Sequence, residues 1–220
     1  MHSAGTAVAP VGGGGGEGPE EAAAPLGSAA APEDDGVIPP FRGATPILGE
    51  RVFLAETAAV VGDVALGDDV SIWYGSVVRG DCCTIRIGAR SNVQDNSTLH
   101  VTKDVGPLLL EEEVTLGHNC VVHACTIRRG ALVGMNATVL DGAEIGEKAL
   151  VAAGSVVLGG TRVPPRTLWA GSPARLRRPL TDAEADGLDA YWRNYLEYKE
   201  EYLREDARRG RSLPFPVPVL

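Results

Sequence analysis

The 220-residue sequence has few aromatic residues, no C-x-x-C pair and no long apolar run. Its four cysteines lack the spacing of zinc ribbons and thioredoxin-type motifs, so we expect reduced thiols in a reducing compartment. No stretch of about 18 apolar residues occurs, and no direct membrane span is expected. A net charge of −9 argues against a nucleic-acid-binding surface.

Most of the negative charge lies in the first 40 residues, which contain six acidic residues and no Lys or Arg. These residues are otherwise rich in Ala, Gly and Pro, with too little apolar surface to offset the entropy of ordering them. We expect residues 1–40 to form a disordered or partner-docked acidic tail. The segment has neither the Arg-rich pattern of a mitochondrial presequence nor the apolar core of a secretory signal.

From about residue 47, aliphatic residues recur every six positions. The series is Leu54, Val60, Leu66, Ile72 and Val78, then Ile87, Val93 and Leu99, and then Val121, Ile127, Val133, Val139, Ile145, Val151 and Val157. Four positions after each later member, small residues recur from Cys125 to Ser155, so large and small side chains are expected to share the interior. A period of six fits neither an α-helix nor a hairpin meander. It resembles the hexapeptide repeat of a left-handed parallel β-helix, which we predict over residues 47–170.

Two features interrupt or punctuate this repeat. Glycine often follows the inward residue, and we interpret these positions as turns that need positive φ: Gly67, Gly88, Gly134 and Gly146. Residues 101–113 do not keep the six-residue phase, and we predict that they form a loop projecting from one corner. Loops on rigid scaffolds often carry function.

A capping box, Thr181-x-x-Glu184, predicts a helix over residues 181–206, followed by a tail at 207–220. Five of the eleven aromatic residues lie between positions 191 and 202. Three of them belong to a stripe at helical spacing: Leu188, Trp192, Tyr195, Lys199 and Tyr202. We expect this face to pack on its own solenoid, with a neighbouring subunit as the alternative.

Three of the four histidines, His100, His118 and His123, fall within 24 residues. If Leu99 and Val122 both point inward, His100 and His123 project from the same side of stacked coils. His118 is five residues before His123 and falls around a corner, too far to share one metal ion with the other two. A three-histidine site would then need a second subunit. Three imidazoles with an open fourth position are a catalytic zinc arrangement.

Three further motifs precede the histidines in the sequence. They are Ser71-Ile72-Trp73-Tyr74-Gly75, Arg79-Gly80-Asp81 and Asn92-Val93-Gln94-Asp95-Asn96. Together they resemble the γ-class carbonic anhydrases over roughly residues 50–200. The resemblance is strongest to the γ-carbonic-anhydrase-like subunits of mitochondrial NADH dehydrogenase, which is respiratory complex I. It implies reversible hydration of CO2 to bicarbonate, a zinc ion (or iron or cobalt), and a trimer.

The same resemblance assigns roles to individual residues. His100 and His123 of one chain and His118 of the next would bind the metal ion. Gln94 and Asn92 would line the site and orient hydroxide and substrate as catalytic residues.

Charged residues near the histidines are assigned by the resemblance as well. Ion pairs at the subunit interface would involve Arg79, Asp81 and Asp95. One position departs from the family pattern, because the archetypal active member has a Glu for proton transfer where this chain has Cys82. A second proton-carrying acid is expected after the first histidine, and its candidates are Asp104, Glu111, Glu112 and Glu113.

The resemblance leaves alternatives open for function, partners and location. The chain is either an active carbonic anhydrase or a structural or assembly subunit with the same fold; a hexapeptide acyltransferase is a third reading, which leaves the clustered histidines unexplained. Its trimer would be a homotrimer or a heterotrimer with related subunits, hosted by the membrane-bound respiratory complex. The implied location is the matrix side of the mitochondrial inner membrane, with the cytoplasm as the alternative.

Overall fold

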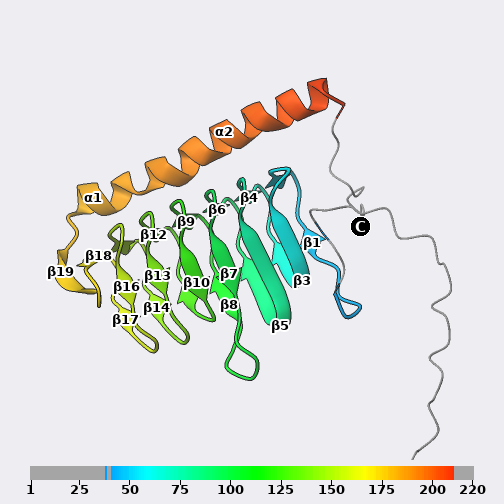
Figure 1. Ribbon diagram of the computed structural model, residues 1–220. Coiled ribbons are helices and arrows are strands. Elements are labelled where there is room, and N and C mark those ends of the chain that lie inside the picture. Colours follow the sequence, from blue (N-terminus) through cyan, green and yellow to red (C-terminus); the bar gives the residue numbers. More distant parts are fainter. Residues whose placement is uncertain (1–37, 39–40, 211–220) are drawn as a thin grey trace, which may run out of the picture. The chain divides into compact units, whose positions relative to one another are not determined.

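The computed structural model describes residue 38 and residues 41–210. Most of the two predicted tails, 1–40 and 207–220, lies outside the described residues. The described chain forms a left-handed parallel β-helix, followed by two helices that run along it (Figure 1). The predicted fold class is therefore confirmed.

Short parallel strands stack on the equivalent strands of the next coil and form three faces. Two faces join into one 11-stranded sheet, because β3 and β5 run continuously around the corner between them. Its strands are β1 (Ile47–Leu48), β3 (Ala59–Leu66), β5 (Val77–Ile87), β7 (Thr98–His100), β8 (Leu108–Leu110), β10 (Val121–His123), β11 (Thr126–Ile127), β13 (Thr138–Val139), β14 (Glu144–Ile145), β16 (Val156–Val157) and β17 (Arg162–Val163).

The third face is an 8-stranded sheet. Its strands are β2 (Phe53–Leu54), β4 (Ser71–Ile72), β6 (Asn92–Val93), β9 (Thr115–Leu116), β12 (Leu132–Val133), β15 (Leu150–Val151), β18 (Thr167–Ala170) and β19 (Arg175–Pro179). All of these strands pair in parallel except β19, which pairs antiparallel with β18 and ends the sheet.

The core consists of the aliphatic and small residues that recur every six positions. All the aliphatic residues predicted to point inward between Leu54 and Val157 are buried, with one exception. Val121 is 40% exposed, and its neighbour Val122 is fully buried instead. The prediction for Val121 was wrong because the step from Val122 to Ile127 has five residues rather than six, with Ala124 at positive φ in the turn.

The loop predicted over residues 101–113 is shorter in the structure. β8 lies within this range and pairs with β5 and β11, so that Leu110 aligns with Ile87 and Ile127 in the core. Only the segment around residues 102–106 projects, closed by a bridge between Thr102 and Gly106. The prediction failed because the apolar run of β8 re-enters the repeat at a shifted phase.

Glycines after the inward residues serve a different purpose from the one predicted. Gly67, Gly88, Gly134 and Gly146 do not adopt positive φ. Instead, they lie against the backbone of the next coil, and a Cβ atom added at Gly134 would stand 2.5 Å from the backbone nitrogen of Ala153. The close spacing of stacked coils, not turn geometry, therefore requires glycine at these positions.

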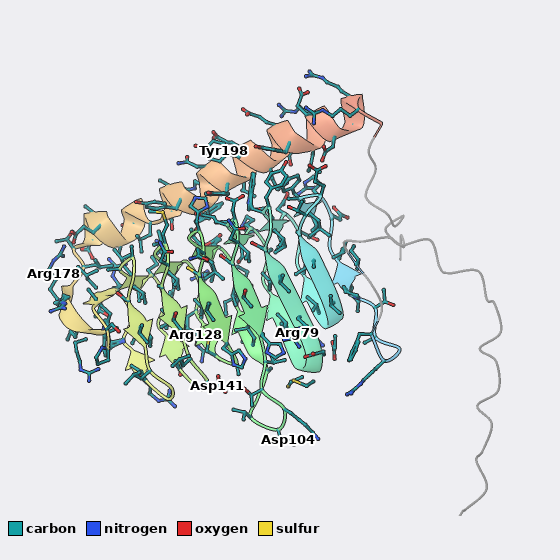
Figure 2. All side chains as sticks on the ribbon, in the orientation of Figure 1. Arg79, Asp104, Arg128, Asp141, Arg178 and Tyr198 are labelled. Carbon is teal, nitrogen blue, oxygen red and sulfur yellow. The ribbon has the colours of Figure 1, made fainter. Side chains whose placement is uncertain are left out.

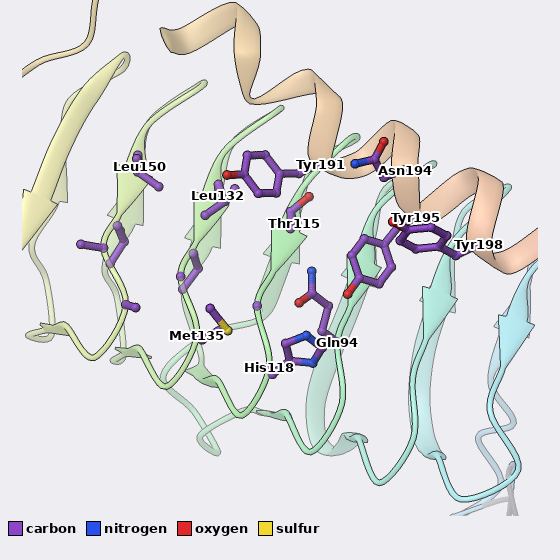
Figure 3. Close-up of a pocket in the computed structure, with 16 residues that line it drawn as sticks. Gln94, Thr115, His118, Leu132, Met135, Leu150, Tyr191, Asn194, Tyr195 and Tyr198 are labelled. Atoms are coloured by element: carbon purple, nitrogen blue, oxygen red, sulfur yellow. The ribbon is translucent and has the colours of Figure 1, made fainter.

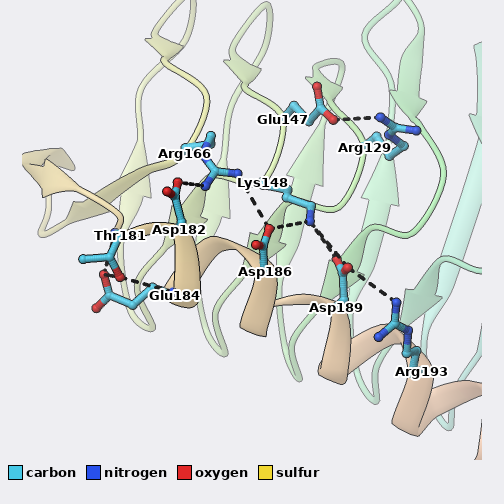
Figure 4. A network of polar contacts seen from close by, with 10 residues as sticks. All are labelled: Arg129, Glu147, Lys148, Arg166, Thr181, Asp182, Glu184, Asp186, Asp189 and Arg193. Atoms are coloured by element: carbon cyan, nitrogen blue, oxygen red, sulfur yellow. Dashed lines mark hydrogen bonds and ion pairs between the residues drawn. The ribbon is translucent and has the colours of Figure 1, made fainter.

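The C-terminal helices are α1 (Asp182–Gly187) and α2 (Asp189–Arg208). The predicted capping box is present, because the Thr181 hydroxyl accepts from the Glu184 amide and the Glu184 carboxylate accepts from the Thr181 amide. Lys148 of the solenoid reaches Asp186 and Asp189, with its Nζ at 3.2 and 3.3 Å from their carboxylate oxygens (Figure 4). These ion pairs join the helical segment to the coils.

The aromatic face of α2 packs on its own solenoid, as we expected. The ring centroid of Trp73 lies 5.2 Å from the ring centroids of both Tyr195 and Tyr202. Lys199 is fully buried at the same contact, and its Nζ lies 3.0 Å from Asp69. No helix in residues 41–210 is long and apolar enough to cross a membrane.

Replacing Gly134 with Ala should destabilise the solenoid by about 1–3 kcal/mol, because the new Cβ would overlap the next coil. Gly187→Ala is a matched control, since nothing lies within 4 Å of a Cβ at that position. Its effect should stay below about 1 kcal/mol. Chemical denaturation measures both values, and equal effects of the two substitutions would refute the close-approach explanation.

Asp69→Asn should lower stability at pH 7 and weaken the acid sensitivity of the fold. Burial raises the pKa of Asp69, but hydrogen bonds from Arg51 and Lys199 outweigh it, and the pKa lies below 3.8. The ionised carboxylate therefore stabilises the fold above pH 3.8, and this contribution disappears as pH falls through the folded-state pKa. Urea unfolding at several pH values measures the difference, with the more exposed Asp63→Asn as the control. An unchanged acid dependence in Asp69→Asn would contradict this account.

Candidate functional site

His100 and His123 lie side by side on one face of the solenoid. The pairing of β7 with β10 aligns the two residues, and the pairing of β5 with β7 places Arg79 in the same row. Because Leu99 and Val122 are fully buried, the neighbouring histidines point outward. Nδ1 of His100 lies 3.0 Å from Nε2 of His123.

A carboxylate meets the other ring nitrogen of each histidine. Asp81 Oδ1 lies 3.0 Å from Nε2 of His100, and Asp141 Oδ1 lies 2.6 Å from Nδ1 of His123. A carboxylate at the outer nitrogen accepts its N–H and leaves the inner nitrogen with a free lone pair. Two such lone pairs facing each other repel unless a cation lies between them.

This arrangement suits a metal ion. Two imidazole nitrogens that share a tetrahedral ion at 2.0–2.1 Å are about 3.3 Å apart, close to the 3.0 Å separation of the inner nitrogens. The outer carboxylates would fix the ring orientation, as they do for many metal-binding histidines. His100 and His123 therefore fit two of the ligand positions of one ion.

Asp81 is held in its ionised form. Burial raises the pKa of its carboxyl, but hydrogen bonds from His100 and Arg79 outweigh burial and lower the pKa to about 2. Arg79 and Asp81 form an ion pair within the chain. Figure 2 shows Arg79 on the side of the solenoid away from α2, whose Tyr198 is also labelled.

Sequence reasoning missed Asp141 and Thr102. Thr102 Oγ1 donates to Asp141 Oδ2 at 2.6 Å; this bond is the largest cause that lowers the pKa of Asp141, burial opposes it, and the bond from His123 adds to it. The available signal was a carboxylate 18 residues after His123, which is about one coil further along. Thr102 connects the projecting loop to this contact.

His118 lies apart from the other two histidines. It is in the turn between β9 and β10, and its Nδ1 lies 2.8 Å from Asp95 Oδ2. It lines a pocket of about 510 Å³ beneath α2, together with Gln94, Met135 and Tyr195 (Figure 3). The structure thus separates His118 from the facing pair and groups it with other residues.

A short chain of hydrogen bonds holds Gln94 in the wall of this pocket. Asn92 is fully buried and donates from its Nδ2 to Thr115 Oγ1 at 2.9 Å. Gln94 in turn donates from Nε2 to Asn92 Oδ1 at 3.2 Å. In the single chain, Gln94 therefore lines the pocket with His118, and the buried Asn92 holds Gln94 through a hydrogen bond.

The candidate proton-carrying acids are spread over the surface. Asp104 is exposed in the short projecting loop. Glu111 forms an ion pair with Arg128 at 2.7 Å, and Glu113 forms one with Arg90 at 2.9 Å. Glu112, between them in sequence, is exposed. The ion pairs of Glu111 and Glu113 are with arginines rather than with the histidines.

Cys82 is exposed next to Asp81, and its Sγ donates to the carbonyl oxygen of Val101 at 3.2 Å. Desolvation of the thiol by its neighbours raises its pKa, and the Asp81 carboxylate raises it further. The thiol is therefore protonated at neutral pH, unlike the carboxylate that the family pattern has at this position.

Known proteins resemble this chain in sequence and in fold. A family model for "Bacterial transferase hexapeptide (six repeats)" matches residues 124–159. The chain is 41% identical to "Gamma carbonic anhydrase 2, mitochondrial" of Arabidopsis thaliana, over 74% of this chain and 61% of the plant protein, so it spans less than two thirds of that relative. It is also 41% identical to a "Carbonic anhydrase" of Geobacillus kaustophilus, over 76% of this chain and 91% of the bacterial protein.

A solved structure extends the comparison to the fold. It is a putative acetyltransferase of Bacillus cereus with 41% sequence identity and a TM-score of 0.74. The similar region covers 76% of this chain and 96% of the bacterial chain.

Asp141 should determine which nitrogen of His123 carries the proton. In the unsubstituted protein, ¹⁵N NMR of the imidazoles should show His123 protonated at Nδ1, because that nitrogen faces the carboxylate. Asp141→Leu should shift His123 toward a mixture of tautomers. Asp63→Asn changes a carboxylate elsewhere on the solenoid and should leave the spectrum of His123 unaltered. An unchanged His123 tautomer in Asp141→Leu would contradict this role.

Proposed function

The chain belongs to the γ-class carbonic anhydrase family, and on this basis we propose that it catalyses the reversible hydration of CO2 to bicarbonate at a metal centre shared between two copies of the chain. The observation that carries the proposal is the facing pair of His100 and His123, 3.0 Å apart and each backed by a carboxylate. A third histidine, His118, is present, but it lines a pocket beneath α2 rather than lying beside the facing pair.

The metal ion would be held by His100 and His123 of one chain and by His118 of the partner subunit. Zinc is the default, because three imidazoles with an open fourth position are a catalytic zinc arrangement. Iron(II) and cobalt(II) accept the same donors. The chemistry that such an ion supplies is the activation of a water molecule near neutral pH. Closed three-fold association of the chain would provide one such site at each interface.

Gln94 and Asn92 would orient the reacting molecules. The amide nitrogen of Gln94 is used in the bond to Asn92, so its amide oxygen can accept a hydrogen bond in the pocket. The buried bond from Asn92 to Thr115 fixes both amides in place. A rigid acceptor next to CO2 places the substrate without a reorganisation cost during the reaction.

Proton release is the step for which this chain is poorly equipped. Hydration of CO2 releases one proton in each turnover, and Cys82 occupies the position of the proton-carrying acid in the family pattern. With Glu111 and Glu113 in ion pairs, the exposed acids Asp104 and Glu112 remain, and Asp104 follows His100 more closely in the chain. We expect turnover that depends on the concentration of external buffer.

A structural role in mitochondria is the second candidate. The name of the Arabidopsis relative places that protein in mitochondria, and the thiol at position 82 weakens the case for rapid catalysis. In this case the chain would form a heterotrimer with related subunits and act as a platform in the respiratory NADH dehydrogenase complex. Purifying the chain alone discriminates between the candidates: a stable, metal-loaded homotrimer supports the enzyme, and a chain that is soluble only with related subunits supports the platform.

Mixing two inactive variants tests the shared centre. Loss of a residue that only hydrogen-bonds to a metal ligand costs roughly 10–100-fold in activity. His118→Ala and His123→Ala each remove a ligand itself and should lower CO2 hydration by more than this. In randomly mixed trimers, about one quarter of the interfaces should combine an intact His100/His123 pair with an intact third histidine. Activity and bound metal should therefore recover to about one quarter of the unsubstituted values.

Two differently tagged copies of His118→Ala, mixed in the same way, provide the control and should stay inactive. A failure of the mixture to recover would contradict the shared centre. Recovery of bound metal without CO2 hydration would leave the metal site in place and refute the enzymatic activity.

A further inference from the structure

A second set of metal-binding donors lies within one chain. Donor atoms of Asp81, Cys82 and His100 all lie within 4.8 Å of one another. Two of the residues come from β5 and the third from β7, which pairs with it. Since these strands belong to the rigid solenoid, the three side chains stay close together without any partner subunit.

The three donors are of different chemical types. They offer a carboxylate oxygen, a thiolate sulfur and an imidazole nitrogen, a combination that zinc accepts in tetrahedral sites. Nε2 of His100, the nitrogen that faces Asp81, is on the opposite side of the ring from the nitrogen that faces His123. The second donor set and the facing histidine pair therefore use different nitrogens of one ring.

We propose that Asp81, Cys82 and His100 form a binding site for a thiophilic divalent cation, such as Zn²⁺ or Cd²⁺, within a single chain. Binding releases the Cys82 thiol proton to solvent and forms a metal–sulfur bond. The proton on Nε2 of His100 moves to Nδ1, which can donate it to Nε2 of His123, 3.0 Å away. Nε2 of His100 and the Asp81 carboxylate, freed from their mutual hydrogen bond, then become ligands. Neither oxidation nor reduction is involved.

The charges around the site decide which cations it takes. The Arg79 guanidinium pairs with Asp81 and disfavours a second positive charge nearby. Hard cations such as Mg²⁺ and Ca²⁺, which rely on carboxylate oxygens, gain too little here to overcome this repulsion. A thiophilic cation gains a bond to sulfur that does not depend on Asp81. The site is therefore selective for soft metals.

Cys82 is the cysteine that can serve this site. Cys120 and Cys125 are buried in the core, and Cys83 is partly buried with its side chain packed against the core. Cys83→Ser is thus a matched control for Cys82→Ser, since both remove one thiol at adjacent positions. The proposal does not depend on CO2 hydration, although the site shares His100 with the proposed intersubunit centre.

Titration of the full-length protein with Co²⁺ tests the proposal, because a cobalt–thiolate bond absorbs in the near ultraviolet. The band should appear in the unsubstituted protein and in Cys83→Ser, and it should be absent in Cys82→Ser. It should persist in His118→Ala, because the site needs no histidine from a partner. Loss of the band in His118→Ala would overturn the proposal by placing Cys82 in the intersubunit centre, and a band that persists in Cys82→Ser would overturn it directly.

Cadmium provides the measurement of affinity. Cd²⁺ should protect Cys82 from alkylation. Cys82→Ser removes a ligand, so it should weaken Cd²⁺ binding by more than the roughly 10–100-fold lost when a residue that only hydrogen-bonds to a ligand is removed. Equal Cd²⁺ affinity in the unsubstituted protein and in Cys82→Ser would refute the site. CO2 hydration is not part of either readout, so failure of the proposed activity and failure of this site are distinguishable.

Discussion

The stacking of each coil on the next, about 4.8 Å apart, is the constraint on which the candidate site depends. It places Arg79, His100 and His123 in one row, although loop residues separate them in sequence. The extra residues around 102–106 project outward, so they lengthen the sequence between the histidines without disturbing the pairing of β7 with β10. Because a parallel ladder fixes neighbours on every coil, the geometry of the histidine pair follows from backbone pairing rather than from flexible side chains.

The same geometry keeps the third histidine apart. A chain that turns a corner between β9 and β10 cannot aim His118 and His123 at one point, and this is why the proposed centre needs two chains. The helices pack on the 8-stranded sheet, as the clusters around Leu132, Leu188 and Trp73 show. They leave uncovered the face that carries His100, which agrees with association through that face.

Much of this architecture could be predicted from the sequence, because a repeat of six residues is set by local burial alone. The core and the capping box at Thr181 follow from such local rules. The exceptions arise where contacts between coils decide. The predictions for Val121 and Gly134 were wrong because both depend on neighbouring coils. A shortened turn exposes Val121, and the backbone of the next coil lies close to Gly134; a repeat pattern predicts neither. Asp141 was missed because its partner, His123, is a full coil away.

The central claim is that one metal ion joins two chains through histidines of both. An anomalous-scattering map of the zinc-loaded assembly, recorded at the zinc absorption edge, tests this claim most directly. We expect one peak per interface, between His100 and His123 of one chain and His118 of the partner subunit. A peak bound by residues of a single chain, with none at the interface, would contradict it.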